Sequence, residues 1–133
     1  MEWCLKLPYP PSINHYKKVG RIVKTKTGKL YQQRVDTNET KSFYFYTYMA
    51  AKKYMPAGWT QFSESETIKY FMKVYLYPPN NLRFDADNRL KVLCDGLVKA
   101  HVLKDDSQIH RLYVEKCSIV EGGEVIVRIQ PYE

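Results

Sequence analysis

The sequence predicts an α/β (α+β) fold, in which a mixed β-sheet of about four strands carries two main helices. The prediction rests on the order of the expected elements: a strand, a hairpin, a helix, a strand, a second helix and two closing strands. The 133 residues, 44% hydrophobic and 26% charged, match one ordinary globular domain with a continuous core. We therefore expect residues 1–133 to form a single domain.

The expected elements begin with a strand and a hairpin. We expect Trp3–Leu7 to form the first strand, which stops at Pro8 because proline cannot donate a ladder hydrogen bond. Arg21–Val23 and Leu30–Gln32 flank a turn at Lys26-Thr27-Gly28-Lys29, and this pattern indicates a hairpin.

A first helix is expected after the hairpin. Asp36 and Glu39 have the spacing of a capping box with Asp36 as the N-cap, and Pro56 and Gly58 end the helix after about Tyr54. Residues near one face of this helix are Phe43, Tyr46, Ala50 and Tyr54. We expect this stripe to pack in the core.

The second half of the chain is expected to supply three strands and a helix. Thr67–Tyr77 alternates between an apolar face and a face that is aromatic and basic. Asp87–Ala100 repeats apolar residues at helical spacing. Tyr113–Val120 and Glu124–Gln130 flank Glu121-Gly122-Gly123, so we expect them to pair as a closing hairpin.

Positive charge is concentrated near the start of the chain. The net charge is +7, and residues 3–35 contain eight basic residues and no acidic one, which accounts for the whole surplus. This asymmetry favours a polyanion as partner, and the tyrosines in the same segment suit stacking on bases. The alternative is a solvated basic loop that aids solubility.

No feature of the sequence points to a membrane or to an oxidising compartment. No apolar run is long enough to cross a bilayer, and the first residues lack the pattern of a signal peptide. The three cysteines, Cys4, Cys94 and Cys117, contain no Cys-x-x-Cys pair, which argues against a disulfide framework or a zinc site. We expect a cytoplasmic protein.

An acidic cluster within this basic chain is the main functional signal. Asp85 and Asp87 lie two residues apart, Lys91 follows one helical turn later, and Asp105 and Asp106 lie beyond the helix. Carboxylate oxygens bind hard cations such as Mg²⁺, which bridge to substrate phosphates. The pattern predicts a divalent-metal phosphodiesterase site.

Structural explanations compete for parts of this cluster. Asp87 at the helix start can serve as a cap, and Lys91 between Asp87 and Asp95 can form surface ion pairs worth about 0.2–0.5 kcal/mol each. An EF-hand is excluded, because the required glycine and glutamate are missing from its sixth and twelfth positions. Periodicity leaves open whether Asp106 returns to the first pair, since the helix carries the chain ~20 Å away.

Two separate stretches resemble the RusA-type Holliday junction resolvases, the crossover junction endodeoxyribonucleases common in bacterial and prophage genomes. Leu7-Pro8-Tyr9-Pro10-Pro11-Ser12-Ile13-Asn14 is similar to the family's Leu-Pro-x-Pro-Pro-Ser-x-Asn signature. Asp85-Ala86-Asp87-Asn88 with Lys91, then Asp95-Gly96-Leu97 and Asp105-Asp106-Ser107-Gln108, follow the family's Asp-x-Asp-Asn-x-x-Lys, Asp-x-Leu and Asp-Asp-x-Gln pattern in order and spacing. Residues 20–67 carry no such signature.

The resemblance implies a RusA-like homodimer and assigns roles to individual residues. It implies that Asp85, Asp87 and Asp106 are catalytic and bind Mg²⁺, with Mn²⁺ as a substitute, and that Lys91 assists catalysis. Three further positions match the pattern with supporting roles: Asn88, Asp95 and Asp105. Six residues are candidates for DNA contact, and the basic ones near the start of the chain are chosen for their charge and not for the resemblance: Asn14, Tyr16, Lys17, Lys18, Arg21 and Arg83.

The reaction expected from this resemblance is Mg²⁺-dependent hydrolysis of DNA at a four-way (Holliday) junction, by paired symmetric nicks, during recombination and repair. Two nicks in symmetry-related strands need two sites in matching orientation, which a C2 homodimer provides. The expected partners are branched DNA and a second copy of the chain, with no membrane and no nucleotide cofactor. The alternatives are a general branched-DNA or flap nuclease, and a catalytically inactive DNA-binding module whose aspartates are caps and ion pairs.

Overall fold

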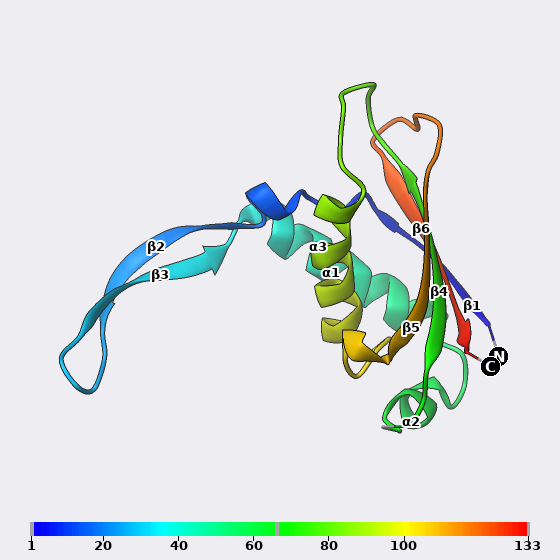
Figure 1. Ribbon diagram of the computed structural model, residues 1–133, viewed down its shortest axis with the longest axis horizontal. Helices are drawn as coiled ribbons and strands as arrows, with labels where there is room; N and C mark the ends of the chain where they lie inside the picture. Colours follow the sequence, from blue (N-terminus) through cyan, green and yellow to red (C-terminus); the bar gives the residue numbers. More distant parts are fainter. Residues whose placement is uncertain (1, 66, 133) are drawn as a thin grey trace.

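A four-stranded sheet with two helices packed on one face forms the body of the protein (Figure 1). The structure is a computed structural model that describes residues 2–65 and 67–132. The strand order is β1 (Trp3–Pro8), β6 (Glu124–Pro131), β4 (Tyr70–Tyr77) and β5 (Ile109–Lys116). Strand β6 runs antiparallel to β1 and β4, whereas β4 and β5 are parallel. The predicted fold class, a mixed sheet of about four strands with two main helices, is confirmed.

The parallel pair results from a crossover through a helix. The chain leaves β4, enters α3 (Asp87–Lys99), and then passes through a short 3₁₀ helix, η2 (Asp106–Gln108), into β5. The expected closing hairpin is therefore wrong, because β4 lies between β5 and β6. A parallel pair needs a long crossover, and α3 provides it. The segment after β5 instead follows the end of β4, where the Cys117 N–H donates to the Leu76 carbonyl at 2.7 Å.

The first helix, α1 (Asn38–Tyr54), has a different N-cap from the one expected. The cap is Thr37, whose hydroxyl accepts the Thr40 N–H at 3.3 Å. The expected cap, Asp36, is instead the last residue of a strand, where its carboxylate lies 3.7 Å from the Lys17 ammonium. The shift arises because Asp36 pairs across strands with Lys17 and so remains extended.

The core-facing side of α1 also differs from the expected aromatic stripe. Its buried residues are Thr40, Phe43, Thr47 and Ala51. Tyr46 and Tyr54 are 56% and 61% exposed, so their expected place in the core is wrong. The two buried threonines differ: the Thr40 hydroxyl donates to the Tyr16 carbonyl at 2.8 Å, whereas the buried Thr47 hydroxyl has no hydrogen-bond partner among the described residues.

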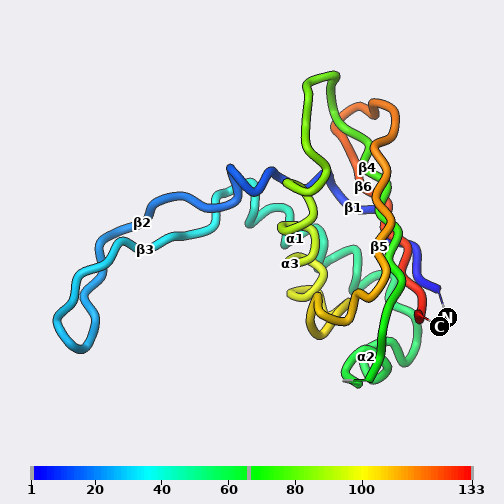
Figure 2. The backbone as a smooth tube through the Cα atoms, viewed as in Figure 1, coloured from blue at the N-terminus to red at the C-terminus, as the bar shows by residue number. Residues whose placement is uncertain are grey.

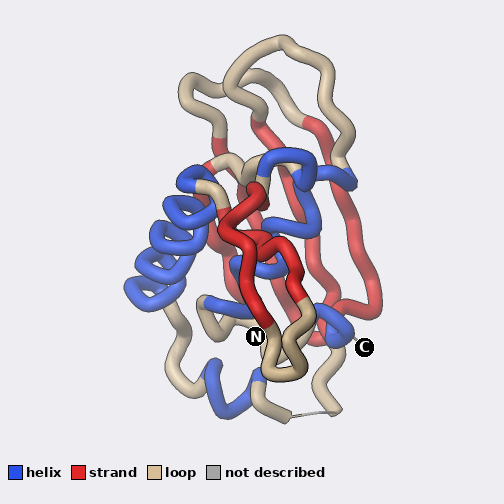
Figure 3. The backbone as a smooth tube through the Cα atoms, turned by 90° about the vertical axis from the view of Figure 1, so that its left-hand side faces the viewer, coloured by secondary structure: helices blue, strands red, loops and turns tan. Residues whose placement is uncertain are grey.

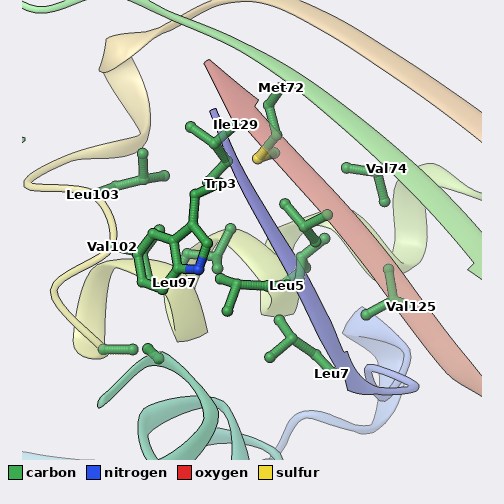
Figure 4. Packing of buried hydrophobic residues seen from close by; sticks show 14 of the residues in the cluster. Trp3, Leu5, Leu7, Met72, Val74, Leu97, Val102, Leu103, Val125 and Ile129 are labelled. Atoms are coloured by element: carbon green, nitrogen blue, oxygen red, sulfur yellow. The ribbon is translucent and has the colours of Figure 1, made fainter. Parts of the chain in front are cut away.

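The core lies between the sheet and the two helices (Figure 4). The predicted inner face of β4 is confirmed, since its residues Tyr70, Met72, Val74 and Leu76 are fully buried. A short helix that the sequence analysis did not predict, α2 (Trp59–Ser63), adds the buried Trp59 ring, whose Nε1 donates to the Val102 carbonyl at 2.8 Å. None of the helices in the described ranges is both long and apolar enough to span a membrane.

The basic segment near the start of the chain forms an arm that projects from the body (Figure 2). Strands β2 (Lys17–Lys24) and β3 (Leu30–Asp36) pair with each other as a separate two-stranded sheet, which confirms and extends the predicted hairpin. A short 3₁₀ helix, η1 (Ile13–His15), precedes the arm, and the start of α1 follows it. We call residues 17–36 the basic arm.

Candidate active site

Two of the predicted acidic residues lie at the start of α3. Asp87 is the first residue of the helix, Asp85 stands two positions earlier, and both are exposed. Asp87 is not the N-cap, because Ala86 holds that position and the helix has no side-chain cap. The Asn88 amide donates to the Asp85 carboxylate at 3.5 Å. The positive end of the helix dipole favours negative charge at this place.

A cavity of about 410 Å³ opens beside Asp85. The residues that line it come from two segments distant in sequence: Ser12 and Asn14 lie around η1, and Arg83 and Asn88 lie on either side of Asp85. Asn14 and Arg83 are both candidates for DNA contact. The structure therefore brings two of these candidates together with one candidate metal ligand.

Two cations that the sequence analysis did not single out hold this region together. Arg89 of α3 donates from Nη1 to the Pro10 carbonyl at 3.0 Å, and its guanidinium lies 4.9 Å from the centre of the Tyr9 ring. Lys116 of β5 donates to the Phe84 carbonyl, and its ammonium lies 4.7 Å from the centre of the Phe84 ring. The proline-rich segment is thus tied to α3, and the loop before α3 is tied to the sheet.

The chain reverses direction after α3 and returns alongside it. His101 adopts a left-handed backbone with φ 62°, and the Val102 N–H donates to the Leu97 carbonyl at 2.9 Å. This is a Schellman motif, and Val102 at its end is fully buried. As a result η2 packs against α3. The helix C-terminus therefore turns the chain back along α3, and Asp106 lines a cavity with Lys91 and Asp95, whereas Asp85 lines a different cavity.

Gln108 anchors the returning loop. Its buried side chain accepts the Lys104 N–H at Oε1, at 2.9 Å, and donates from Nε2 to the Ser63 carbonyl, also at 2.9 Å. Asp105 caps η2 by accepting from Ser107, and Gln108 completes this capping box. In the sequence, Gln108 stands out only as part of a motif. Its hydrogen bonds in the folded chain show that it holds the acidic turn.

A second cavity, of about 420 Å³, holds the remaining acidic residues of the motifs. Its acidic lining residues are Asp36, Asp95, Asp105 and Asp106, and they share the cavity with Lys17 and Lys91. The Lys91 ammonium lies 2.9 Å from the Asp95 carboxylate. The ion pair that the helical spacing suggested as a structural explanation for Lys91 is therefore present, in the same cavity as Asp106.

The ionisation of this second cavity reflects crowded negative charge. The pKa of Asp106 is raised, first by its hydrogen bond with Asp105 and then by burial, whereas hydrogen bonds from Ser107 lower the pKa of Asp105. The pKa of Lys91 is raised by its hydrogen bond and charge interaction with Asp95, which keeps the ammonium charged. A raised pKa means that the charged form of the Asp106 carboxyl is disfavoured, and a bound cation would stabilise that charged form.

The three aspartates expected to bind metal are spread along α3. Asp85 borders the first cavity, Asp87 begins the helix, and Asp106 borders the second cavity. Among the described residues, no three His, Cys, Asp or Glu side chains converge closely enough to hold a metal ion. The donor set still suits Mg²⁺, because it consists of exposed carboxylate oxygens.

The remaining candidates for DNA contact lead from the site into the basic arm. Tyr16 is half-buried at the base of the arm, with the Lys17 ammonium 5.6 Å from its ring centre. Lys17 also lines the second cavity, whereas Lys18 and Arg21 are exposed farther along β2. These residues therefore connect the acidic site to the arm.

Tyr44 and Asp36 are among the residues of the second cavity that were not predicted as site residues from the sequence. Tyr44 of α1 lines it, and its pKa is raised by burial and then by the charges of Asp95 and Asp36. Asp36 itself was expected only as a helix cap. No local sequence signal distinguishes either residue, because both reach the cavity through the packing of α1 and the base of the arm against α3.

The chain belongs to the RusA endodeoxyribonuclease family. The family profile described as Endodeoxyribonuclease RusA matches residues 8–130, which confirms the resemblance seen in the two motifs. A relative from Aquifex aeolicus (strain VF5), named crossover junction endodeoxyribonuclease RusA, is 39% identical over 61 residues. The match covers 45% of this chain and 48% of the relative, so the chain spans about half the length of the relative that it matches.

Proposed function

We propose that this protein is an endodeoxyribonuclease that cuts four-way DNA junctions by paired symmetric nicks, with Mg²⁺ held by Asp85, Asp87 and Asp106. The observation that carries the proposal is the order and spacing of the acidic motifs, in a chain whose family match spans residues 8–130. The name of the Aquifex aeolicus relative, crossover junction endodeoxyribonuclease, supports a crossover junction as the substrate.

In this proposal, the residues along α3 have separate roles in the reaction. Asp85, Asp87 and Asp106 would supply carboxylate oxygens to the ion, which requires these side chains to lie closer together with the ion than they do without it. When bound, a divalent ion supplies an activated water and offsets charge on the phosphate. Lys91 stabilises the negative charge that develops on the scissile phosphate, and its ion pair with Asp95 keeps it protonated before DNA arrives.

Other residues hold the site and the DNA. The Asn88 amide orients the Asp85 carboxylate, and the turn at Asp105 presents the acidic residue that follows it. Asn14 and Arg83 contact the DNA backbone next to the cavity at Asp85. The basic arm supplies further phosphate contacts, so affinity should fall steeply with salt concentration.

The reaction also defines an assembly. One chain carries one set of acidic motifs, whereas a four-way junction requires two nicks in symmetry-related strands. A C2 homodimer supplies two sites in matching orientation. We therefore propose that the active form is a homodimer.

The test is incubation of the purified protein with a mobile synthetic four-way junction in Mg²⁺, Mn²⁺ or EDTA. We expect nicks at symmetry-related positions with either metal and no nicks in EDTA. A flap and a linear duplex of matched sequence serve as controls. Equal cleavage of all three substrates would identify a general branched-DNA nuclease, and binding without cleavage in both metals would identify an inactive DNA-binding module.

A further inference from the structure

The outer side of α1 carries large apolar side chains exposed to solvent. Phe45 is 58% exposed, Tyr46 56% and Met49 48%, and the rings of Phe45 and Tyr46 lie 5.3 Å apart in an edge-to-face arrangement. Figure 3 shows α1 at an edge of the molecule, with one side free of the other described elements. Contiguous exposed apolar side chains are characteristic of surfaces that bind a partner.

The outward residues of α1 follow a regular spacing. Five exposed residues recur at alternating intervals of three and four positions: Glu39, Ser42, Tyr46, Met49 and Lys53. This is the spacing with which one helix packs lengthwise against another. The buried stripe of α1 is a separate set of residues, so this row is not used by the core. We call these five residues the α1 seam.

The charges of the α1 seam are self-complementary. Glu39 lies near the N-terminal end of α1 and Lys53 near its C-terminal end, each seven residues from Tyr46. If two copies of α1 pack antiparallel about a twofold axis at Tyr46, Glu39 of each copy lies opposite Lys53 of the other. Neither residue forms an ion pair within the described parts of one chain. Both charges are therefore available to a partner.

We propose that the α1 seam is the interface through which two copies of this chain form a C2 homodimer, with the α1 helices antiparallel and Tyr46 at the axis. The inference rests on the proposed function for its biological need, since two nicks need two sites, and it adds which surface brings the two copies together. DNA is a poorer occupant for this face, because the centre of the seam is apolar and its two charges, Glu39 and Lys53, give no net positive charge.

The first test places a charge in the centre of the α1 seam. Tyr46→Glu and Met49→Glu are compared with Ile119→Glu, which alters an apolar residue of similar exposure (54%) in the loop before β6. By sedimentation equilibrium, we expect the wild type and Ile119→Glu to be dimers. The two seam variants should dimerise at least ~100-fold more weakly, because each substitution acts twice at a twofold axis. Thermal unfolding checks that all variants remain folded.

The proposal is overturned if the wild-type chain stays monomeric up to about 100 µM. A dissociation constant at that concentration corresponds to a dimerisation free energy of roughly 5 kcal/mol. Folded seam variants that dimerise as tightly as the wild type would also overturn it. Equal weakening by Ile119→Glu would place the contact elsewhere and would count against the α1 seam.

The second test uses the predicted charge pairing. Glu39→Lys and Lys53→Glu should each weaken dimerisation about tenfold, because each creates two like-charge contacts per dimer. A tenfold change in the dissociation constant corresponds to about 1.4 kcal/mol. The double variant restores opposite charges and should recover the wild-type dissociation constant to within about threefold. A double variant that is weaker than either single variant would contradict the antiparallel arrangement.

Junction cleavage separates this proposal from the proposed function. A monomeric Tyr46→Glu variant should still nick a four-way junction in Mg²⁺ but should lose the pairing of the nicks. If the wild type dimerises through the α1 seam and cuts no DNA, the proposed function fails and the interface stands. If the wild type makes paired nicks while Tyr46→Glu does so equally well, the interface fails and the proposed function stands.

Discussion

The two halves of the candidate active site are held in different ways. Asp85 and Asp87 lie close together in the chain, at the exposed start of α3, with one amide hydrogen bond from Asn88. Asp105 and Asp106 reach α3 only after a chain reversal at a residue with φ 62° and are held by a buried glutamine. The first half is thus a local feature of the sequence, and the second is built by tertiary contacts.

This difference predicts how substitutions in each half change activity and stability. Substitutions in the first half should remove chemistry and leave the fold intact, because the side chains are exposed. Substitutions in the supports of the second half should change stability as well as chemistry, since buried hydrogen bonds hold the turn. Four sets of variants test this difference.

The largest effect is expected from the acidic residues themselves. Asp87→Asn and Asp106→Asn should each reduce nicking of a four-way junction at least ~100-fold, because each removes an anionic oxygen ligand from the proposed metal site. Asp36→Asn is the matched control, since Asp36 lines the same cavity as Asp106 but lies outside the motif. Single-turnover cleavage measures all three. Loss of activity with only one of the first two would show that Asp87 and Asp106 do not serve the same site.

The next effect tests the anchor of the second half. Gln108→Leu removes the acceptor of the Lys104 N–H and the donor to the Ser63 carbonyl, so both hydrogen bonds of this buried side chain are lost. We expect a loss of about 2–3 kcal/mol in the free energy of unfolding, measured with urea, together with slower nicking. Ser107→Ala alters an exposed hydroxyl of the same turn and should cost less than about 1 kcal/mol. Equal stability of the two variants would mean that Gln108 is not the anchor.

A smaller effect is expected where α1 packs against α3. A Cβ added at Gly96 would lie 2.9 Å from Cε2 of the buried Phe43 ring, so Gly96→Ala should destabilise the protein by about 1–2 kcal/mol. Helix propensity alone would instead favour alanine by about 1 kcal/mol. Adding Phe43→Leu should make the alanine less costly. Stabilisation by Gly96→Ala would show that α1 and α3 do not approach this closely.

The smallest effect tests the chain reversal. His101 has a left-handed backbone that glycine adopts without a steric cost, so His101→Gly should stabilise the protein by about 0.5–1 kcal/mol. Thermal unfolding should show a raised midpoint and unchanged nicking. His101→Val, with a β-branched side chain, should be destabilising instead. A lower midpoint for the glycine variant would contradict the Schellman turn.

The elements that the sequence predicted correctly are those with a strong local pattern. β4 alternates and buries Met72 and Val74, and α3 begins at Asp87 as expected. The errors concern which strands pair with each other and which side chains pack in the core. The closing strands do not pair because β4 separates them, and Tyr46 lies outside the core because threonines of α1 take core positions. Local patterning carries no information about strand order or about which polar side chains find buried partners.

The family can be recognised from the sequence, because the order and spacing of the aspartates, of Lys91 and of the proline-rich segment are properties of the chain alone. The cavity that Asp106 shares with Lys91 and Asp95, and the row of α1 that faces outward, become visible only in the folded protein. These outcomes depend on contacts between distant residues, such as the hydrogen bond from Gln108 to the Ser63 carbonyl across 45 positions of the chain. Such contacts form only when sheet and helices pack together.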